Sequence, residues 1–251
     1  MKEKKQTREE AEKNRVKTNI DGFDTMLKGG LLSGRNILLS GPCGSGKTIF
    51  AMQFAYNGAL QGENTLYVTL EESKEKLYED MLKFGFDLKK VEEEGKFLII
   101  GGPIASIHSY MEKVDADINN LIKEIEEVVK ENNIKRVVID SVNLLTMLLE
   151  TEEERRKALA SLSNTLSSLG CTAIFTSETK EGSMDLSRYG MEEFVVDGVI
   201  VLYLVRQGSR FVPGIAIRKM RGSDHDKEIR VFRITDKGIV VYPEETMFTN
   251  V

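Results

Sequence analysis

The sequence predicts an α/β fold in which a mostly parallel sheet carries helices on both faces. Three observations predict this fold: a glycine-rich loop between an apolar run and a helical pattern, an alternation of strand and helix patterns as far as residue 176, and a strand-rich C-terminal part. The alternation favours parallel strands joined by crossover helices. The last strands have connections too short for helices, so we expect them to be antiparallel.

The glycine-rich loop fits the pattern GxxxxGK[ST] at every fixed position. It follows the apolar run 36–40 and precedes the helical pattern 49–60. Its glycines let backbone N–H groups turn around a phosphate, and the helix N-terminus adds positive charge there. We therefore expect Lys47 to reach the β and γ phosphates of a nucleotide and Thr48 to bind Mg²⁺. The loop consists of Gly41, Pro42, Cys43, Gly44, Ser45, Gly46, Lys47 and Thr48.

The remaining helices and strands are predicted from helix-ending residues and from the spacing of apolar residues. Gly62 and Gly85 are expected to end helices, and Ser73 to cap one. Apolar and helical periodicity predict strands at 64–70, 97–100, 137–140 and 172–176, helices at 73–84, 115–131 and 152–169, and C-terminal strands at 199–205, 211–220, 229–234 and 239–242.

The composition limits the classes of protein that remain. Residues 1–17 are mostly charged or polar and predict a tail, so we expect one domain over residues 18–251. The net charge of −5 argues against strong electrostatic binding of nucleic acid by the chain as a whole. Cys43 and Cys171 lack metal-ligand spacing and are expected to be reduced thiols of a cytoplasmic protein. No apolar run is long enough to span a membrane.

Acidic residues end two of the predicted strands. Asp140 ends an apolar run and is expected to hold Mg²⁺ through its water shell. Many ATPases carry a carboxylate at the next position, where this chain has Ser141. Glu71 and Glu72 end the strand after the phosphate-loop helix, at the edge where parallel strands present their ligands. We expect Glu71 to be the general base, while Glu72 either assists it or simply begins the next helix.

Several stretches resemble the KaiC family of ATPases, which belongs to the RecA superfamily and is named for a circadian clock protein. They are Gly22-Phe23-Asp24, the phosphate loop, Thr69-Leu70-Glu71-Glu72-Ser73, residues 188–194 (RYGMEEF) and residues 219–225 (KMRGSDH). Together they span nearly all of residues 18–243. The resemblance implies a RecA-like core and an ATPase that binds ATP with Mg²⁺ between the subunits of a ring, expected to be a hexamer.

The resemblance also implies roles for particular residues. Gly44 to Thr48, with Ile49, would hold the triphosphate, Glu71 would be the catalytic base, and Lys83 would contact the nucleotide. Lys219 and Arg221 share one face of a strand, because side chains alternate with a period of two. The residues expected to reach the ATP of a neighbouring subunit are Lys219, Met220, Arg221, Ser223, His225, Thr235 and Asp236.

The chain departs from the clock protein, which has two such domains in tandem where this sequence has one. Residues 181–188 resemble the family's ATPase-type domain, so autophosphorylation is not implied. The alternative function is a DNA recombination or helicase accessory ATPase, which would need basic loops at 101–111 and 180–190. The first of these is almost uncharged, so a nucleic-acid partner is not expected. A nucleotide-gated scaffold without turnover is a third class.

Overall fold

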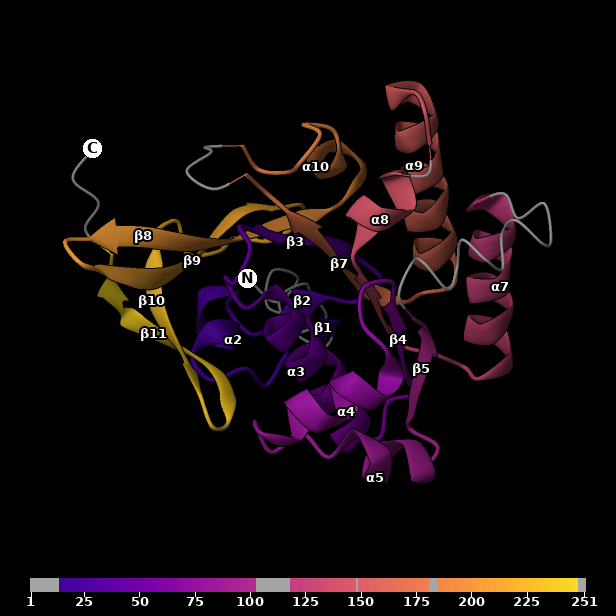
Figure 1. Ribbon diagram of the computed structural model, residues 1–251, viewed down its shortest axis with the longest axis horizontal. Coiled ribbons are helices and arrows are strands. Elements are labelled where there is room, and N and C mark those ends of the chain that lie inside the picture. The colour runs from indigo at the N-terminus through magenta and orange to yellow at the C-terminus, as the bar shows by residue number, and fades with distance from the viewer. Residues whose placement is uncertain (1–13, 103–117, 148, 181–184, 248–251) are drawn as a thin grey trace, which may run out of the picture.

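In a computed structural model, which describes residues 14–102, 118–147, 149–180 and 185–247, the chain forms an α/β fold around a nine-stranded sheet (Figure 1). The strand order is β11-β10-β9-β8-β3-β7-β6-β4-β5. The parallel strands are β3 (Asn36–Gly41), β4 (Thr65–Thr69), β5 (Phe97–Gly101), β6 (Arg136–Asp140), β7 (Thr172–Glu178) and β8 (Gly198–Gln207). The predicted α/β class is confirmed.

The C-terminal strands are antiparallel to one another, as the short connections predicted. They are β9 (Arg210–Met220), β10 (Arg230–Thr235) and β11 (Gly238–Thr246). Strand β8 joins the parallel part of the sheet to its antiparallel part, because it is parallel to β3 on one side and antiparallel to β9 on the other. The hairpins extend the sheet well beyond the parallel core (Figure 1).

Helices cover both faces of the sheet, and two buried clusters fill the space beneath them. Leu38 and Leu39 belong to opposite clusters, because successive side chains of a strand point to opposite faces. The first face carries α2 (Phe23–Met26), α3 (Lys47–Leu60), α4 (Lys74–Leu82) and α5 (Leu88–Glu93). The second carries α7 (Ile118–Glu131), α8 (Val142–Met147), α9 (Glu152–Ser168) and α10 (Glu192–Val195). None of the helices in the described ranges is both long and apolar enough to cross a bilayer.

The structure differs from the expected elements at a few places. Strand β1 (Arg15–Val16) pairs with β2 (Leu31–Leu32), so ordered chain precedes the expected start at Thr18. The cause is the Arg15 guanidinium, which donates to two backbone carbonyls, that of Gly30 at 2.7 Å. Helices α5 and α8 were not expected, since six residues are too few for a clear period. The predicted helix start at 115–117 lies outside the described residues.

Candidate functional site

The phosphate loop connects β3 to α3 and has the conformation that its sequence predicts. Gly44 and Gly46 have positive φ angles of 74° and 92°, which other residues adopt only with strain. A Cβ at Gly41 would lie 2.7 Å from the carbonyl oxygen of Leu202. These positions therefore require glycine, and the loop leads directly into the first turn of α3 at Lys47.

Lys47 is folded over the loop. Its Nζ donates to the carbonyl oxygens of Gly41 at 3.0 Å and Pro42 at 2.9 Å. Burial lowers the pKa of Lys47, while the nearby carboxylates of Glu178 and Asp140, and more weakly that of Glu71, act in the opposite direction. One ammonium group therefore lies among three carboxylates that come from three different strand ends.

Asp140 ends β6 and is 6% exposed. The Tyr67 hydroxyl donates to its Oδ2 at 2.6 Å, and the Thr176 hydroxyl donates to its Oδ1. Burial and the charge of Asp140 raise the pKa of Tyr67 well above its usual value, so the phenol keeps the proton that it donates. Both oxygens are thus oriented, and each keeps a lone pair for a further donor such as a metal-bound water.

The residues present fit a magnesium ion. Thr48 lies in the first turn of α3, and a hydroxyl, a carboxylate, phosphate oxygens and waters are the ligands that Mg²⁺ prefers. The carboxylates of Asp140, Glu71 and Glu178 outnumber the ammonium group of Lys47. A divalent cation would balance that excess of negative charge.

Glu71 and Glu72 have different partners in the structure. The Ser141 hydroxyl donates to Oε1 of Glu71 at 2.7 Å. Partial burial raises the pKa of the Glu71 carboxyl, and the hydrogen bond from Ser141 opposes that rise. Glu72 lies just before Ser73, the N-cap of α4, and forms an ion pair at 2.6 Å with Lys76 in the first turn of that helix. Of the two roles considered for Glu72, this geometry favours that of a residue that begins the helix.

Glu178 was not among the site residues expected from the sequence. In the register of β3 with β7, Glu178 lies opposite Gly41, and its carboxylate is the first of the charges that counter the burial of Lys47. Its backbone N–H donates to the side-chain oxygen of Asn143, which fixes the strand end. The signal was available, because an acid follows the apolar strand 172–176 just as Glu71 follows its own strand.

A second group of predicted residues lies at the end of the sheet where the parallel strands begin, here called the amino edge. The phosphate loop lies at the other end of the same strands, the carboxyl edge. Lys219 pairs with Val199, which pairs with Leu38 of β3. The N–H of Arg221 donates to Asp197 O at 3.0 Å, and the N–H of Asp197 donates to Asn36 O at 2.8 Å. Arg221 is therefore level with the start of β3, whereas the phosphate loop follows its end. Five residues of strand separate these levels by about 16 Å.

Most members of this second group are hydrogen-bonded or buried within the chain. Lys219 Nζ donates to the carbonyl oxygens of Glu193 at 2.7 Å and Val196 at 2.6 Å, and burial followed by the charge of Arg221 lowers its pKa. The Arg221 side chain is 55% exposed and lies 3.9 Å from Asp197. The remaining members are Met220, which is buried, Ser223, which accepts from Arg15 at 2.8 Å, and His225, whose Nε2 lies 3.1 Å from Lys227 Nζ.

Thr235 and Asp236 lie apart from that group within the chain, although the sequence grouped them with Lys219 as residues expected to reach the ATP of a neighbouring subunit. The β10–β11 hairpin folds back across α3, and Ile234 Cδ1 lies 3.1 Å from the position that a Cβ of Gly46 would occupy. Asp236 O lies 4.0 Å from the corresponding position at Gly85. The turn therefore lies beside its own phosphate loop and the end of α4, where Lys83 forms an ion pair with Asp80 at 2.7 Å.

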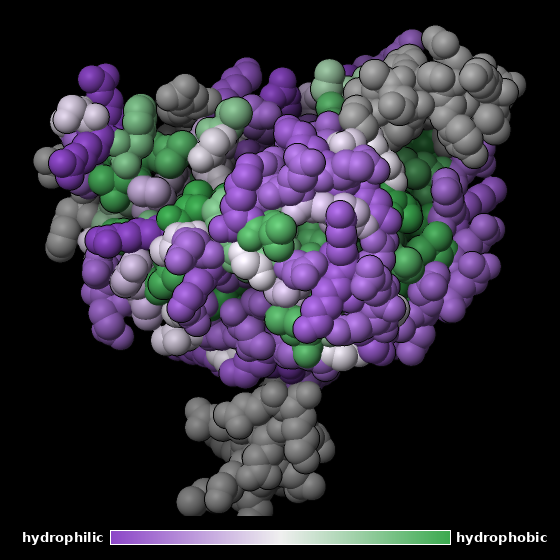
Figure 2. Space-filling model, turned by 60° about the horizontal axis from the view of Figure 1, so that its bottom comes forward, coloured by the Kyte–Doolittle hydropathy of each residue, from purple (hydrophilic) through white to green (hydrophobic). Residues whose placement is uncertain are grey.

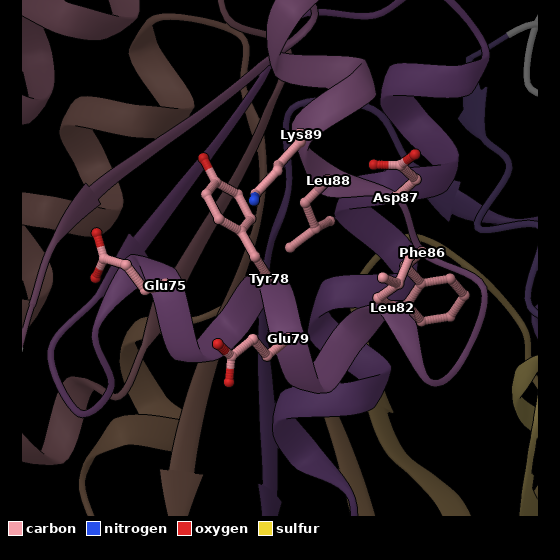
Figure 3. A pocket seen from close by; sticks show the side chains of 8 residues that line it. All are labelled: Glu75, Tyr78, Glu79, Leu82, Phe86, Asp87, Leu88 and Lys89. Atoms are coloured by element: carbon pink, nitrogen blue, oxygen red, sulfur yellow. The ribbon is translucent and has the colours of Figure 1, made fainter.

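Two surface pockets flank these elements. One of about 450 Å³ adjoins the phosphate loop, and its lining residues are Pro42, Cys43, Glu178, Thr179, Lys180, Arg188, Leu204 and Phe211. Another of about 340 Å³ lies between α4 and α5, and its lining residues are Glu75, Tyr78, Glu79, Leu82, Phe86, Asp87, Leu88 and Lys89 (Figure 3). No residue predicted to bind the nucleotide lines the second pocket. That side of the molecule is mostly hydrophilic with small hydrophobic patches (Figure 2).

A glycine-rich loop between β3 and α3, with acids at the ends of neighbouring parallel strands, defines a nucleotide-binding protein of the P-loop class. Residues 16–246 match the family described as "ATPase: KaiC", and the chain belongs to that family. The resemblance found in the sequence is thereby confirmed.

Relatives of known sequence and structure agree with this family. A UPF0273 protein of Pyrococcus furiosus is 36% identical over 239 residues, covering 93% of this chain and 96% of that protein. The circadian clock oscillator protein KaiC of Synechococcus elongatus is 37% identical over 232 residues, which are 91% of this chain and 44% of that protein. The crystal structure of a KaiC-like protein from Pyrococcus horikoshii is similar with a TM-score of 0.81 and 41% identity, covering 91% and 99% of the two chains.

Proposed function

We propose that this protein binds ATP with Mg²⁺ and hydrolyses it at the carboxyl edge of the parallel sheet. The observation that carries the proposal is the gathering of Lys47, at the start of α3, with Glu71, Asp140 and Glu178, from the ends of three neighbouring strands, around one phosphate loop. A fixed cation, a metal-binding acid and a second acid held by a hydroxyl are the parts that phosphoryl transfer to water requires.

In this mechanism the loop N–H groups and Lys47 bind the phosphates. Thr48 and Asp140 would hold the magnesium ion, which when bound neutralises charge on the phosphate oxygens. Glu71 accepts the proton of the attacking water, and Ser141 fixes one oxygen of that carboxylate so that the other can face the water. Tyr67 and Thr176 keep the Asp140 carboxylate in place.

We further propose that the subunits form a ring in which Arg221 and Lys219 act on the nucleotide of the next subunit. These cations lie at the amino edge of the sheet, too far from their own phosphate loop to reach it. Contact between the amino edge of one copy and the carboxyl edge of the next is head-to-tail, and such contacts form a ring where the rotation between copies closes. The family resemblance favours a hexamer. The free thiols of Cys43 and Cys171 are consistent with a reducing, cytoplasmic location.

Lys47→Ala is expected to weaken ATP binding by more than about tenfold, or about 1.4 kcal/mol, because Lys47 is the cation that the loop directs at the phosphates. Calorimetric titration measures the affinity. Lys76→Ala, which removes an exposed lysine paired with Glu72, is the matched control and should bind normally. Normal ATP affinity in a folded Lys47→Ala protein would refute the phosphate site.

Ser141→Ala is expected to move the acidic limb of the pH–rate profile to higher pH. The Ser141 hydroxyl donates to the ionised form of Glu71 and so lowers its pKa, and its removal lets that pKa rise further. Because a base works only when ionised, hydrolysis would then be lost at a higher pH as the solution is acidified. Ser141→Thr retains a hydroxyl and is the matched control. A limb that does not move would separate Glu71 from the rate-limiting proton transfer.

A further inference from the structure

Gln53 is a buried polar residue on α3 that has no part in the phosphate site described above. It is 6% exposed, and its amide forms two hydrogen bonds with the backbone of one residue on β11. Gln53 Nε2 donates to Ile239 O at 3.2 Å, and the N–H of Ile239 donates to Gln53 Oε1 at 2.7 Å. The side chain thus attaches the C-terminal hairpin to the helix that begins at Lys47.

The packing around this attachment is tight. A Cβ at Gly238 would lie 2.6 Å from Gln53 Oε1 and 2.6 Å from Phe86 Cζ, so only glycine lets the hairpin pack this closely. Across the turn, Ile234 and Ile239 place their Cδ1 atoms 3.1 and 3.6 Å from the position of a Cβ at Gly46. The turn is therefore held against the phosphate loop by apolar contacts at one end and by Gln53 at the other.

The two polar residues of the turn have different surroundings. The Thr235 hydroxyl donates to Gly238 O at 3.0 Å and accepts from the N–H of Lys237 at 3.1 Å, so it shapes the turn itself. Asp236 is exposed, and its backbone adjoins Gly85 at the end of α4. Its carboxylate can accept hydrogen bonds from ribose hydroxyls or a base amino group. A nucleotide whose phosphates occupy the loop must extend its nucleoside away from the loop.

We propose that Gln53 is a positioning residue that holds the β10–β11 turn so that Asp236 contacts the nucleoside half of ATP bound in the same subunit. The inference rests on the proposed binding of ATP. Helix α3 is the shared support: its first residue is the phosphate-binding Lys47, and Gln53 lies less than two turns further along it. Gln53 therefore sets the nucleoside contact without touching the nucleotide.

The test compares ATP with inorganic tripolyphosphate, which has the phosphates but no nucleoside. Gln53→Leu has a similar size but leaves the N–H and carbonyl of Ile239 without partners. We expect its ATP affinity to fall about tenfold, while its affinity for tripolyphosphate stays within about twofold of the wild type. Gln61→Leu is the control, because Gln61 is the C-cap residue of the same helix and its exposed amide donates to Asn57 O at 2.9 Å.

Asp236→Ala should show the same selective loss of ATP affinity, which keeps the proposal testable if Gln53→Leu does not fold. An equal loss of affinity for ATP and for tripolyphosphate in Gln53→Leu would mean that Gln53 merely supports the phosphate loop. Unchanged ATP affinity in the variants would mean that the turn does not contact the nucleoside. Either result overturns the proposal. A wild-type protein that binds neither ligand would instead refute ATP binding itself.

Discussion

Arg221→Ala is expected to lose about 10³-fold in ATP hydrolysis while it still folds and binds ATP through its own phosphate loop. A cation beside the transferring phosphoryl group stabilises charge that is larger in the transition state than in the ground state. Arg221 is 55% exposed and lies 3.9 Å from Asp197, so its removal should cost little stability. Arg218→Ala removes an exposed arginine of β9, the strand that ends just before Arg221, and is the matched control that should remain active.

Mixing the Arg221→Ala protein with Glu71→Gln tests whether the site is shared between subunits. In mixed rings, some interfaces combine an intact Glu71 from one subunit with an intact Arg221 from the next. Phosphate release should then reappear from two nearly inactive proteins. If the subunits exchange, as shown by fluorescence energy transfer, and no activity returns, Arg221 does not act on the neighbouring nucleotide.

Glu71→Gln is expected to lose about 10²-fold or more in hydrolysis with ATP affinity retained. Glutamine keeps the shape of the side chain and an oxygen that accepts from Ser141, but it cannot take a proton from water. Single-turnover phosphate release and calorimetric titration on one preparation separate catalysis from binding.

Glu72→Gln is the matched control for Glu71→Gln, since Glu72 is paired with Lys76 and should leave turnover nearly unchanged. An inactive Glu72→Gln protein beside an active Glu71→Gln protein would show that the base had been assigned to the wrong residue.

Local sequence was sufficient for the fold class, the phosphate loop and most of the elements around it. Strand β3, the loop and α3 are contiguous, so their order, their period and the required glycines are all present within residues 36–60. Glu71 and Asp140 were also predictable, because the carboxyl ends of parallel strands meet at one edge. The same rule applies to Glu178, which ends β7 at that edge.

Only the tertiary structure decided which segments that are distant in the sequence lie beside the phosphate loop and which lie far from it. It placed Arg221 at the amino edge of the sheet and the turn of Thr235 and Asp236 beside the phosphate loop of the same chain. It also separated Glu71 from Glu72 and paired Gln53 with the backbone of Ile239, which is 186 residues away. Periodicity predicts which face of a strand is buried, but the level at which a strand lies beside its neighbour depends on pairing between remote segments.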